Sequence, residues 1–241
     1  MAIKVILFDM FDTLMLIEKD HEFYQPALQR AHRYLQNHGV KVAFERFQSV
    51  YIEERDKLYA QADAKLEEPH FNLRFAKTLQ KLGYNYGDQD PVVAAATCEF
   101  GEEFSKYVKV DKNAAATLEA LSGKFRLGLV SNFAIPECVY KLLKAAGIYR
   151  YFDVLVVSGA VNKRKPHPQI FQAALEPLGV EAAEAVFVGD TVDADVEGPK
   201  AVGMHAIYIE RRTQKIEKSL PDKTIKALSE LPLAISSLTE N

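Results

Sequence analysis

The fold of this chain is decided by the stretch Val5-Ile6-Leu7-Phe8-Asp9-Met10-Phe11-Asp12-Thr13-Leu14. An apolar run that leads directly into an acidic turn is typical of a strand buried on both faces, as at the centre of a parallel sheet. Asp9 follows that strand at its carboxyl end, where open α/β sheets bind their ligands. The stretch therefore predicts a central strand with a candidate nucleophile at its tip.

Two hydrophobic periodicities divide the rest of the chain. Helix-period stretches come first, at 23–35, 44–58, 72–82 and 91–107. From residue 114 onward, helices predicted at 114–121, 136–146, 168–178 and 193–201 alternate with strands predicted at 126–130, 154–157, 185–188 and 205–209. Such alternation implies right-handed crossovers and a parallel sheet that includes the first strand, so the helical block is an insertion. The tail from Arg211 is expected to add one strand and, from Lys226, a closing helix.

The composition is that of an ordinary globular protein, and it leaves a small-molecule substrate as the expected partner once nucleic acid is excluded. The chain has 241 residues, of which 48% are hydrophobic and 26% charged, enough for one large domain or for a core with a smaller inserted one. A formal net charge of -3 supplies no basic field of the kind that nucleic acids require. We therefore expect no nucleic-acid partner.

Cysteine use and hydropathy predict a cytoplasmic protein. Cys98 and Cys138 lie in no metal-binding pattern, so two reduced thiols are expected, as in the cytosol. Neither a signal-peptide pattern nor an apolar run of membrane-spanning length is present, so no membrane partner is expected. Both a monomer and a homodimer remain open.

Polar residues stand at four places that follow predicted strands: Asp9, Ser131-Asn132, Lys165 before Pro166, and Gly189-Asp190 with Asp195. Parallel strands bring their carboxyl ends to one edge of the sheet, so these side chains should converge in one crevice. A carboxylate such as Asp9 can attack an electrophilic phosphorus or carbon and form a covalent intermediate that water cleaves. Ser131 and the backbone amide of Asn132 can bind anionic oxygens, and Lys165 can balance developing charge. Asp190 can hold a hard cation, with Asp195 orienting its waters or the lysine.

These segments resemble motifs one to four of the haloacid dehalogenase-like (HAD) hydrolase superfamily: Phe8 to Leu14, Val130-Ser131-Asn132, Lys165-Pro166-His167-Pro168, and Val188-Gly189-Asp190 to Asp195. Their order and the helical insertion after motif one resemble the subgroup with a type 1 cap. The resemblance spans essentially the whole chain. It implies a Rossmann-like α/β core, a parallel sheet flanked by helices, formed by residues 1–16 and 108–241. Residues 17–107 would form an inserted four-helix cap.

The resemblance also implies a role for each matching position. Asp9 would be the nucleophile, Thr13 would steady the motif-one turn, and Ser131, Asn132 and Lys165 would act on the substrate anion. Magnesium (Mg2+) is the implied cofactor, held by Asp9, Asp190 and Asp195 and by the backbone carbonyl of Phe11. The function so implied is a magnesium-dependent phosphohydrolase that acts on a small phosphate ester or acyl phosphate.

Phe11 departs from the pattern of these phosphatases. They usually carry a second aspartate there, which protonates the leaving alcohol and then activates water. Asp12 is displaced by one residue, and on extended backbone such a step points the side chain the other way. Losing a proton-transfer group costs about 10²- to 10⁴-fold in rate, most for alcohols that leave poorly. The loss in rate should be smallest for activated phosphates. We expect Phe11 to contact the substrate instead of acting as an acid.

Two rival hypotheses follow from Phe11. An aromatic residue at this place resembles the L-2-haloacid dehalogenases, which need no metal and whose leaving halide needs no proton. Asp190 argues against them, because without a cation it would repel Asp9. Such an enzyme also needs an arginine in the cap, for which Arg55, our predicted substrate contact, and Arg74 are candidates. The other rival is a catalytically idle binding protein of the same fold.

Overall fold

The computed structural model of the chain describes residues 2–19, 22–211 and 220–239. Its main sheet contains, in spatial order, the parallel strands β5 (Val154–Val157), β4 (Arg126–Ser131), β1 (Val5–Phe8), β6 (Ala185–Gly189), β7 (His205–Ile209) and β8 (Lys223–Ile225). This sheet confirms the predicted α/β fold. The four strands expected after residue 114 begin where predicted, and none ends more than one residue away.

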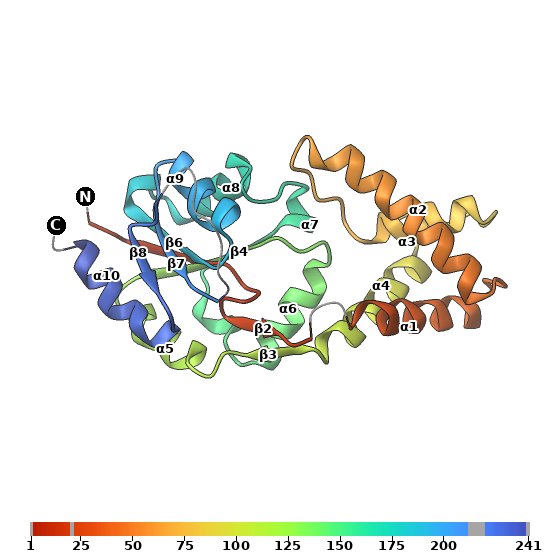
Figure 1. Cartoon of the computed structure of the whole chain (residues 1–241), viewed down its shortest axis with the longest axis horizontal. Coiled ribbons are helices and arrows are strands. Elements are labelled where there is room, and N and C mark those ends of the chain that lie inside the picture. The colour runs from red at the N-terminus through yellow and green to blue at the C-terminus, as the bar shows by residue number, and fades with distance from the viewer. Residues whose placement is uncertain (1, 20–21, 212–219, 240–241) are drawn as a thin grey trace.

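The central strand β1 is buried on both faces, as its composition predicts. Val5 and Leu7 pack with α8 (Pro168–Leu178), whereas Ile6 and Phe8 pack in the cluster that contains residues of α5 (Ala114–Ser122), α6 (Pro136–Ala145) and α10 (Leu231–Thr239). Figure 1 shows α8 and α9 (Gly198–Ala201) on one side of the sheet and the other three helices on the opposite side. Each fully buried side chain of this kind contributes about 1.5–3 kcal/mol to folding.

Two stretches of the carboxyl-terminal half differ from the expected elements. The helix predicted at 193–201 is divided into a π-helical segment, η3 (Val192–Glu197), and the short helix α9, whose first turn contains Pro199. A proline is tolerated there because a first-turn N–H has no partner inside the helix. The expected additional strand is β8, and the closing helix α10 begins at residue 231, later than predicted; part of this tail lies outside the described residues.

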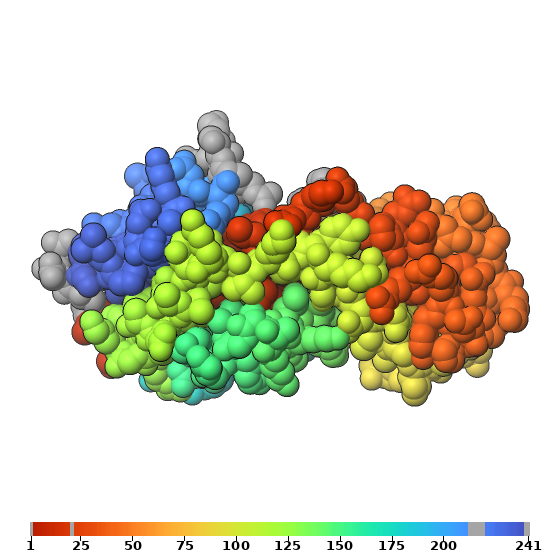
Figure 2. Space-filling model, turned by 90° about the horizontal axis from the view of Figure 1, so that it is seen from below, coloured from red at the N-terminus to blue at the C-terminus, as the bar shows by residue number. Residues whose placement is uncertain are grey.

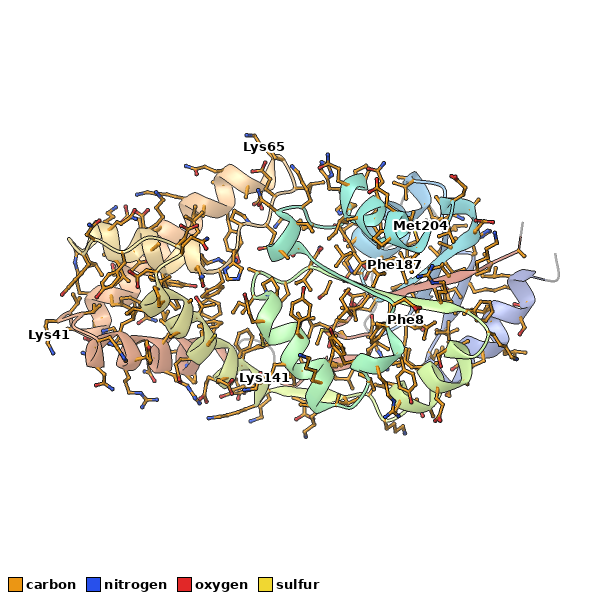
Figure 3. The ribbon with its side chains drawn as sticks, turned by 180° about the vertical axis from the view of Figure 1, so that it is seen from behind. Phe8, Lys41, Lys65, Lys141, Phe187 and Met204 are labelled. Atoms are coloured by element: carbon orange, nitrogen blue, oxygen red, sulfur yellow. The ribbon has the colours of Figure 1, made fainter. Side chains whose placement is uncertain are left out.

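The insertion consists of α1 (Tyr24–Asn37), α2 (Phe44–Asp63), α3 (Asn72–Lys81) and α4 (Pro91–Ser105) in the part of the chain that the structure describes. It extends away from the sheet, and Lys41 lies at its far end (Figure 3). Its interior is rich in aromatic side chains, including Phe47, Phe75 and Phe100, and it shares this cluster with Ala134 and Ile135 of the main body. The insertion therefore packs on the segment that follows β4.

A two-stranded ribbon that the sequence analysis did not predict joins the insertion to the sheet. Strands β2 (Met15–Ile17) and β3 (Val108–Val110) pair in antiparallel fashion. Figure 2 shows these two segments side by side on the surface, between the part of the molecule that contains the main sheet and the helical insertion. A strand of three residues is too short to show the alternating hydrophobic pattern from which strands are predicted.

Shorter elements complete the described chain: the helix α7 (Ser158–Val161) and the 3-10 helices η1 (Tyr149–Tyr151), η2 (Ala182–Glu184) and η4 (Leu228–Glu230). None of the helices in the described residues is long and apolar enough to span a membrane.

Candidate active site

Strand register brings most of the predicted site residues to one edge of the sheet. Phe8 is paired with Leu129 of β4 on one side and with Val188 of β6 on the other. The residues just beyond these strand ends therefore meet. They surround a pocket of about 310 Å³ lined by Asp9, Phe11, Asp12, Asn132, Lys165, Asp190, Thr191, Ala194 and Asp195. The convergence expected from the parallel sheet is thus present in the structure.

Lys165 links two carboxylates at the bottom of this pocket. Its ammonium Nζ lies 2.7 Å from Asp9 Oδ1 and 2.7 Å from Asp195 Oδ1, and all three residues are buried. The same ammonium stands 4.9 Å from the ring centroid of Phe187, which Figure 3 labels on β6. A cation held between two acids and above an aromatic face is well placed to stabilise negative charge at Asp9.

The pKa values of this pair reflect burial and mutual attraction. Burial raises the pKa of Asp9 to about 6, with Asp195 adding to the rise and Lys165 opposing it. Burial disfavours the charged form of Lys165, but Asp195 and Asp9 outweigh it and raise the pKa of the ammonium above its ordinary value. Lys165 is therefore a permanent cation at neutral pH.

Asn132 holds the backbone of Lys165 through its side chain. Its Oδ1 accepts a hydrogen bond from Lys165 N at 2.8 Å, and its Nδ2 donates to Lys165 O at 3.0 Å. Sequence reasoning assigned only the backbone amide of Asn132 a role, and the side-chain clamp became visible only in the structure. The clamp connects the segment after β4 to the loop that carries the lysine.

Two buried hydroxyls near motif one have no hydrogen-bond partner among the described residues. They are Ser131 Oγ and Thr13 Oγ1, and both side chains are completely buried. A buried hydroxyl without a hydrogen-bond partner destabilises the fold by about 1–3 kcal/mol. Binding of a ligand that accepts a hydrogen bond from it is therefore favourable. This is the state expected of Ser131 if it binds a substrate anion. For Thr13, the sequence did not indicate that its buried hydroxyl would lack a hydrogen-bond partner.

The donor set at the strand ends suits a hard divalent cation. Carboxylate oxygens of Asp9, Asp190 and Asp195 lie within 4.8 Å of one another, and all three residues are buried. Magnesium prefers oxygen ligands and is usually held by one or two carboxylates together with water and substrate oxygens. The residues present therefore fit the cofactor that the motif resemblance implied, with Thr191 N donating to Asp195 Oδ2 at 2.9 Å and orienting it.

Gly189 is required by the position of Asp195. A Cβ atom added at Gly189 would lie 2.4 Å from Asp195 Cγ and 2.4 Å from its Oδ2. We expect Gly189→Ala to displace that carboxylate, to lower kcat by about 10- to 100-fold and to destabilise the fold by about 1–3 kcal/mol through overpacking. Steady-state kinetics together with thermal unfolding would check this. Unchanged kcat in a destabilised variant would show that the placement of Asp195 is irrelevant to turnover.

Phe11 connects the catalytic edge to the insertion. Its ring centroid lies 5.5 Å from that of Phe104 on α4 and 4.9 Å from that of Phe133. Asp12 adopts a left-handed backbone with φ of 56°, and its Oδ1 accepts a hydrogen bond from Ile17 N at 3.2 Å. Asp12 therefore stabilises the turn into β2. At position 11, the wall of the pocket is formed by the apolar ring of Phe11.

Arg211 holds the motif-one turn, and sequence reasoning missed it. Its Nε donates to Asp12 O at 3.0 Å, and its Nη2 donates to Thr13 O at 3.1 Å and to Asp111 Oδ2 at 2.6 Å. A signal was present, because Arg211 follows the carboxyl end of β7, the same edge that carries Asp9. The sequence pattern, however, places Arg211 at the start of the tail and predicts no role for it in the site.

The two cap arginines that the sequence offered lie in different surroundings. Arg55, the predicted substrate contact, is not brought to the pocket around Asp9: its Nε donates to Asp56 Oδ1 at 2.8 Å and its guanidinium lies 5.7 Å from the Tyr24 ring centroid. Arg74 is buried and lines a second pocket, of about 200 Å³, which also contains Asn132. Arg74 thus lines a pocket that shares Asn132 with the one around Asp9, and Arg55 lies against Tyr24, which also lines that second pocket.

Comparisons with known proteins identify the family to which this fold belongs. A family model for haloacid dehalogenase-like hydrolases matches residues 3–203. The chain is 31% identical over 213 residues to the glyceraldehyde 3-phosphate phosphatase of Methanopyrus kandleri, covering 87% of this chain and 84% of that protein. Among solved structures, it is similar to a HAD phosphatase from Thermococcus onnurineus, with 28% identity, a TM-score of 0.63, and coverage of 96% of this chain and 97% of that one.

A 2-haloacid dehalogenase from Pseudomonas syringae pv. Tomato shares the fold, with a TM-score of 0.73 at 24% identity over 98% of this chain and 100% of that one. The family match covers most of the chain and includes the segments identified as motifs one to four. It confirms the resemblance drawn from those motifs, and the chain belongs to the haloacid dehalogenase-like hydrolase family.

Proposed function

We propose that this protein is a magnesium-dependent phosphohydrolase in which Asp9 is the nucleophile. The observation that carries the proposal is the buried arrangement at the strand ends, where Lys165 bonds Asp9 and Asp195 at 2.7 Å each and Asp190 completes a cluster of three carboxylates. A dehalogenase displaces halide from carbon and has no need of a third buried carboxylate. A phosphohydrolase with a divalent cation does.

The chemistry follows from the residues around Asp9. An Asp9 carboxylate oxygen attacks phosphorus, the bond to the leaving oxygen breaks, and water later cleaves the aspartyl phosphate to regenerate the carboxylate. Lys165 and the buried Ser131 hydroxyl stabilise charge on the transferring oxygens. A magnesium ion held by Asp9, Asp190, Asp195 and the Phe11 carbonyl would neutralise the phosphoryl group when bound. The helical insertion would serve as the cap, since it lines the second pocket, which shares Asn132 with the pocket around Asp9.

Phe11 limits the leaving groups that this site handles well. Its ring packs against both Phe104 and Phe133, which stack on each other, so the position that usually donates a proton is apolar. The departing oxygen then takes its proton from water, which favours substrates whose leaving group is stable as an anion. Small activated phosphates and acyl phosphates fit best. The relative named glyceraldehyde 3-phosphate phosphatase points to a small alkyl phosphate as a further substrate, one that we expect this site to cleave more slowly.

A cytoplasmic location is part of the same proposal. Cys98 and Cys138 are both free thiols, as expected in a reducing compartment. Small phosphorylated metabolites are also found there.

The test is turnover of acetyl phosphate and p-nitrophenyl phosphate with magnesium and with EDTA. We expect phosphate release that disappears in EDTA and returns when magnesium is added in excess, because Asp9, Asp190 and Asp195 otherwise repel one another. Phosphate release that persists at full rate in EDTA would contradict the metal requirement. A protein that binds the phosphates without turning them over would instead support the idle binding protein.

A second candidate function, the L-2-haloacid dehalogenase, is favoured by Phe11 alone. Chloride release from L-2-chloropropionate in EDTA distinguishes it, because halide departs without a proton and without a metal. We expect no release, since Asp190 remains buried beside Asp9.

A further inference from the structure

A second pocket lies beside the catalytic one, between the insertion and the segment after β4. It has a volume of about 200 Å³, and Asn132 lines both pockets. Its walls include the rings of Tyr24, Phe71 and Phe100. A substrate whose phosphate reaches Asp9 would therefore place the rest of the molecule here, and the volume suits a tail of a few carbon atoms.

An arginine and a glutamate supply the charged groups of this pocket. Arg74 Nη2 lies 3.4 Å from Glu68 Oε1, and the two side chains are only 10% and 12% exposed. The guanidinium carbon of Arg74 lies 4.6 Å from the ring centroid of Phe71 and 4.8 Å from that of Tyr59. Both charges have lost most of their hydration, and a buried pair seldom stabilises a fold enough to explain its presence.

The segment that carries the pair is attached to the main body. Phe71 N donates to Ala134 O at 2.9 Å, and Arg164 N donates to Leu66 O at 2.9 Å. Figure 3 shows that Lys65, in the same segment, lies at the core-facing end of the insertion, whereas Lys41 lies at the far end. The segment that contains the Arg74–Glu68 pair is thus fixed to the main body, beside a pocket that shares Asn132 with the pocket around Asp9.

We propose that the Arg74–Glu68 pair selects phosphate esters whose tail ends in an uncharged hydroxyl or carbonyl group. This inference rests on the proposed phosphohydrolase function. Arginine offers five N–H donors in a fixed fork, and Glu68 offers acceptor oxygens, so a hydroxyl can accept from Arg74 and donate to Glu68, whereas a carbonyl accepts from Arg74 alone. A carboxylate tail would gain from Arg74 but would also lie against the Glu68 carboxylate in a poorly hydrated pocket, where like charges repel strongly.

Three substrates that differ at one carbon test the proposal. Glycerol 3-phosphate, glyceraldehyde 3-phosphate and 3-phosphoglycerate carry a hydroxymethyl, an aldehyde and a carboxylate at the same position. For the wild-type protein we expect kcat/KM for the first two to exceed that for 3-phosphoglycerate by at least about 10-fold, as one lost or repelled polar contact implies. A wild-type preference for 3-phosphoglycerate would overturn the proposal without any variant.

Glu68→Gln removes the repelling charge and keeps the shape of the side chain. We expect the KM for 3-phosphoglycerate to fall and the preference for uncharged tails to shrink by about 10-fold, with kcat for acetyl phosphate unchanged. Glu68→Asp should keep the wild-type preference. Glu45→Gln, on the exposed start of α2, is the matched control for removal of a cap carboxylate and should change neither ratio.

Acetyl phosphate separates failure of this inference from failure of the proposed function, because it has almost no tail to enter the second pocket. No turnover of acetyl phosphate by the wild type would remove the phosphohydrolase itself. Normal turnover of acetyl phosphate with identical substrate ratios in wild type and Glu68→Gln would remove only the role of the pair. Arg74→Met, with exposed Arg33→Met as its control, should raise the KM for all three esters and leave acetyl phosphate unaffected.

Discussion

Asp9→Asn is expected to lower the kcat for phosphate release by at least about 10⁴-fold, since the amide cannot form the covalent intermediate. Asp9 lies at the tip of β1 and bonds Lys165 at 2.7 Å, so the substitution keeps the shape of the site while removing its nucleophile. Single-turnover assays with acetyl phosphate would measure the loss. Intact-mass spectrometry would also show whether the wild-type protein carries a phosphoryl group that the variant lacks.

The same substitution is expected to leave the fold intact. Burial raises the pKa of Asp9 to about 6, above its ordinary value of 3.8, so the ionised carboxylate opposes folding once the pH exceeds both values. An uncharged amide removes that penalty, and Lys165 keeps Asp195 as a partner at 2.7 Å. We therefore expect the Tm of the variant at pH 7.5 to equal or exceed that of the wild type.

Asp193→Asn is the matched control, because Asp193 is exposed on η3 close to the site and lines neither of its pockets. Its kcat should match that of the wild type. If Asp9→Asn retained more than about a tenth of the wild-type rate while folded, another group would have to be the nucleophile and the proposed function would need revision.

Phe11→Asp is expected to raise kcat/KM for glycerol 3-phosphate by about 10²- to 10⁴-fold, the usual contribution of a positioned proton-transfer group. The alkoxide of glycerol leaves poorly without a proton, whereas the acetate of acetyl phosphate leaves readily. The gain should therefore be confined to the alkyl ester. The ratio of the two kcat/KM values is the appropriate measurement, because it reports the first chemical step and not hydrolysis of the intermediate.

This variant also loses packing between the main body and the insertion. The Phe11 ring contacts Phe104 and Phe133 at centroid distances of 5.5 and 4.9 Å. Because Phe11 is only partly buried, we expect a destabilisation on the order of 1–3 kcal/mol, below the range for a fully buried phenylalanine. Thermal unfolding would measure it.

Phe11→Asn is the control for this loss, because it has the shape of aspartate without a proton to donate. It should share the destabilisation and show no gain on glycerol 3-phosphate. Equal gains in the two variants would mean that relief of crowding, not proton transfer, increases the rate. The missing acid would then not explain the substrate preference.

The parallel sheet and its catalytic edge were predictable because they depend on local pattern. The uninterrupted apolar run of β1 requires burial on both faces, and alternation of helices and strands allows few topologies. Once the strands are parallel, Asp9 and Asp190 must lie at the same edge, although they are far apart in the chain. The identities of the pocket residues in motifs one to four could therefore be read from the sequence.

Contacts that depend on packing between distant segments were not predictable. The side-chain clamp of Asn132 on Lys165, the bonds of Arg211 to the motif-one turn and the burial of Arg74 in the second pocket all depend on how distant segments pack together. A sequence pattern specifies periodicity and burial, but not which of several exposed polar side chains will meet another.

The sequence by itself determined that Asp9 and the other motif residues meet at one edge of the sheet and that position 11 has no acid, because both follow from residue type at a strand end. Only the tertiary structure decided what surrounds that site. Long-range packing places Phe11 against the aromatic interior of the insertion and sets Arg74 with Glu68 in the pocket that shares Asn132 with the one around Asp9. Local pattern determines which residue types stand at the strand ends, whereas packing between distant segments determines the side chains that surround them.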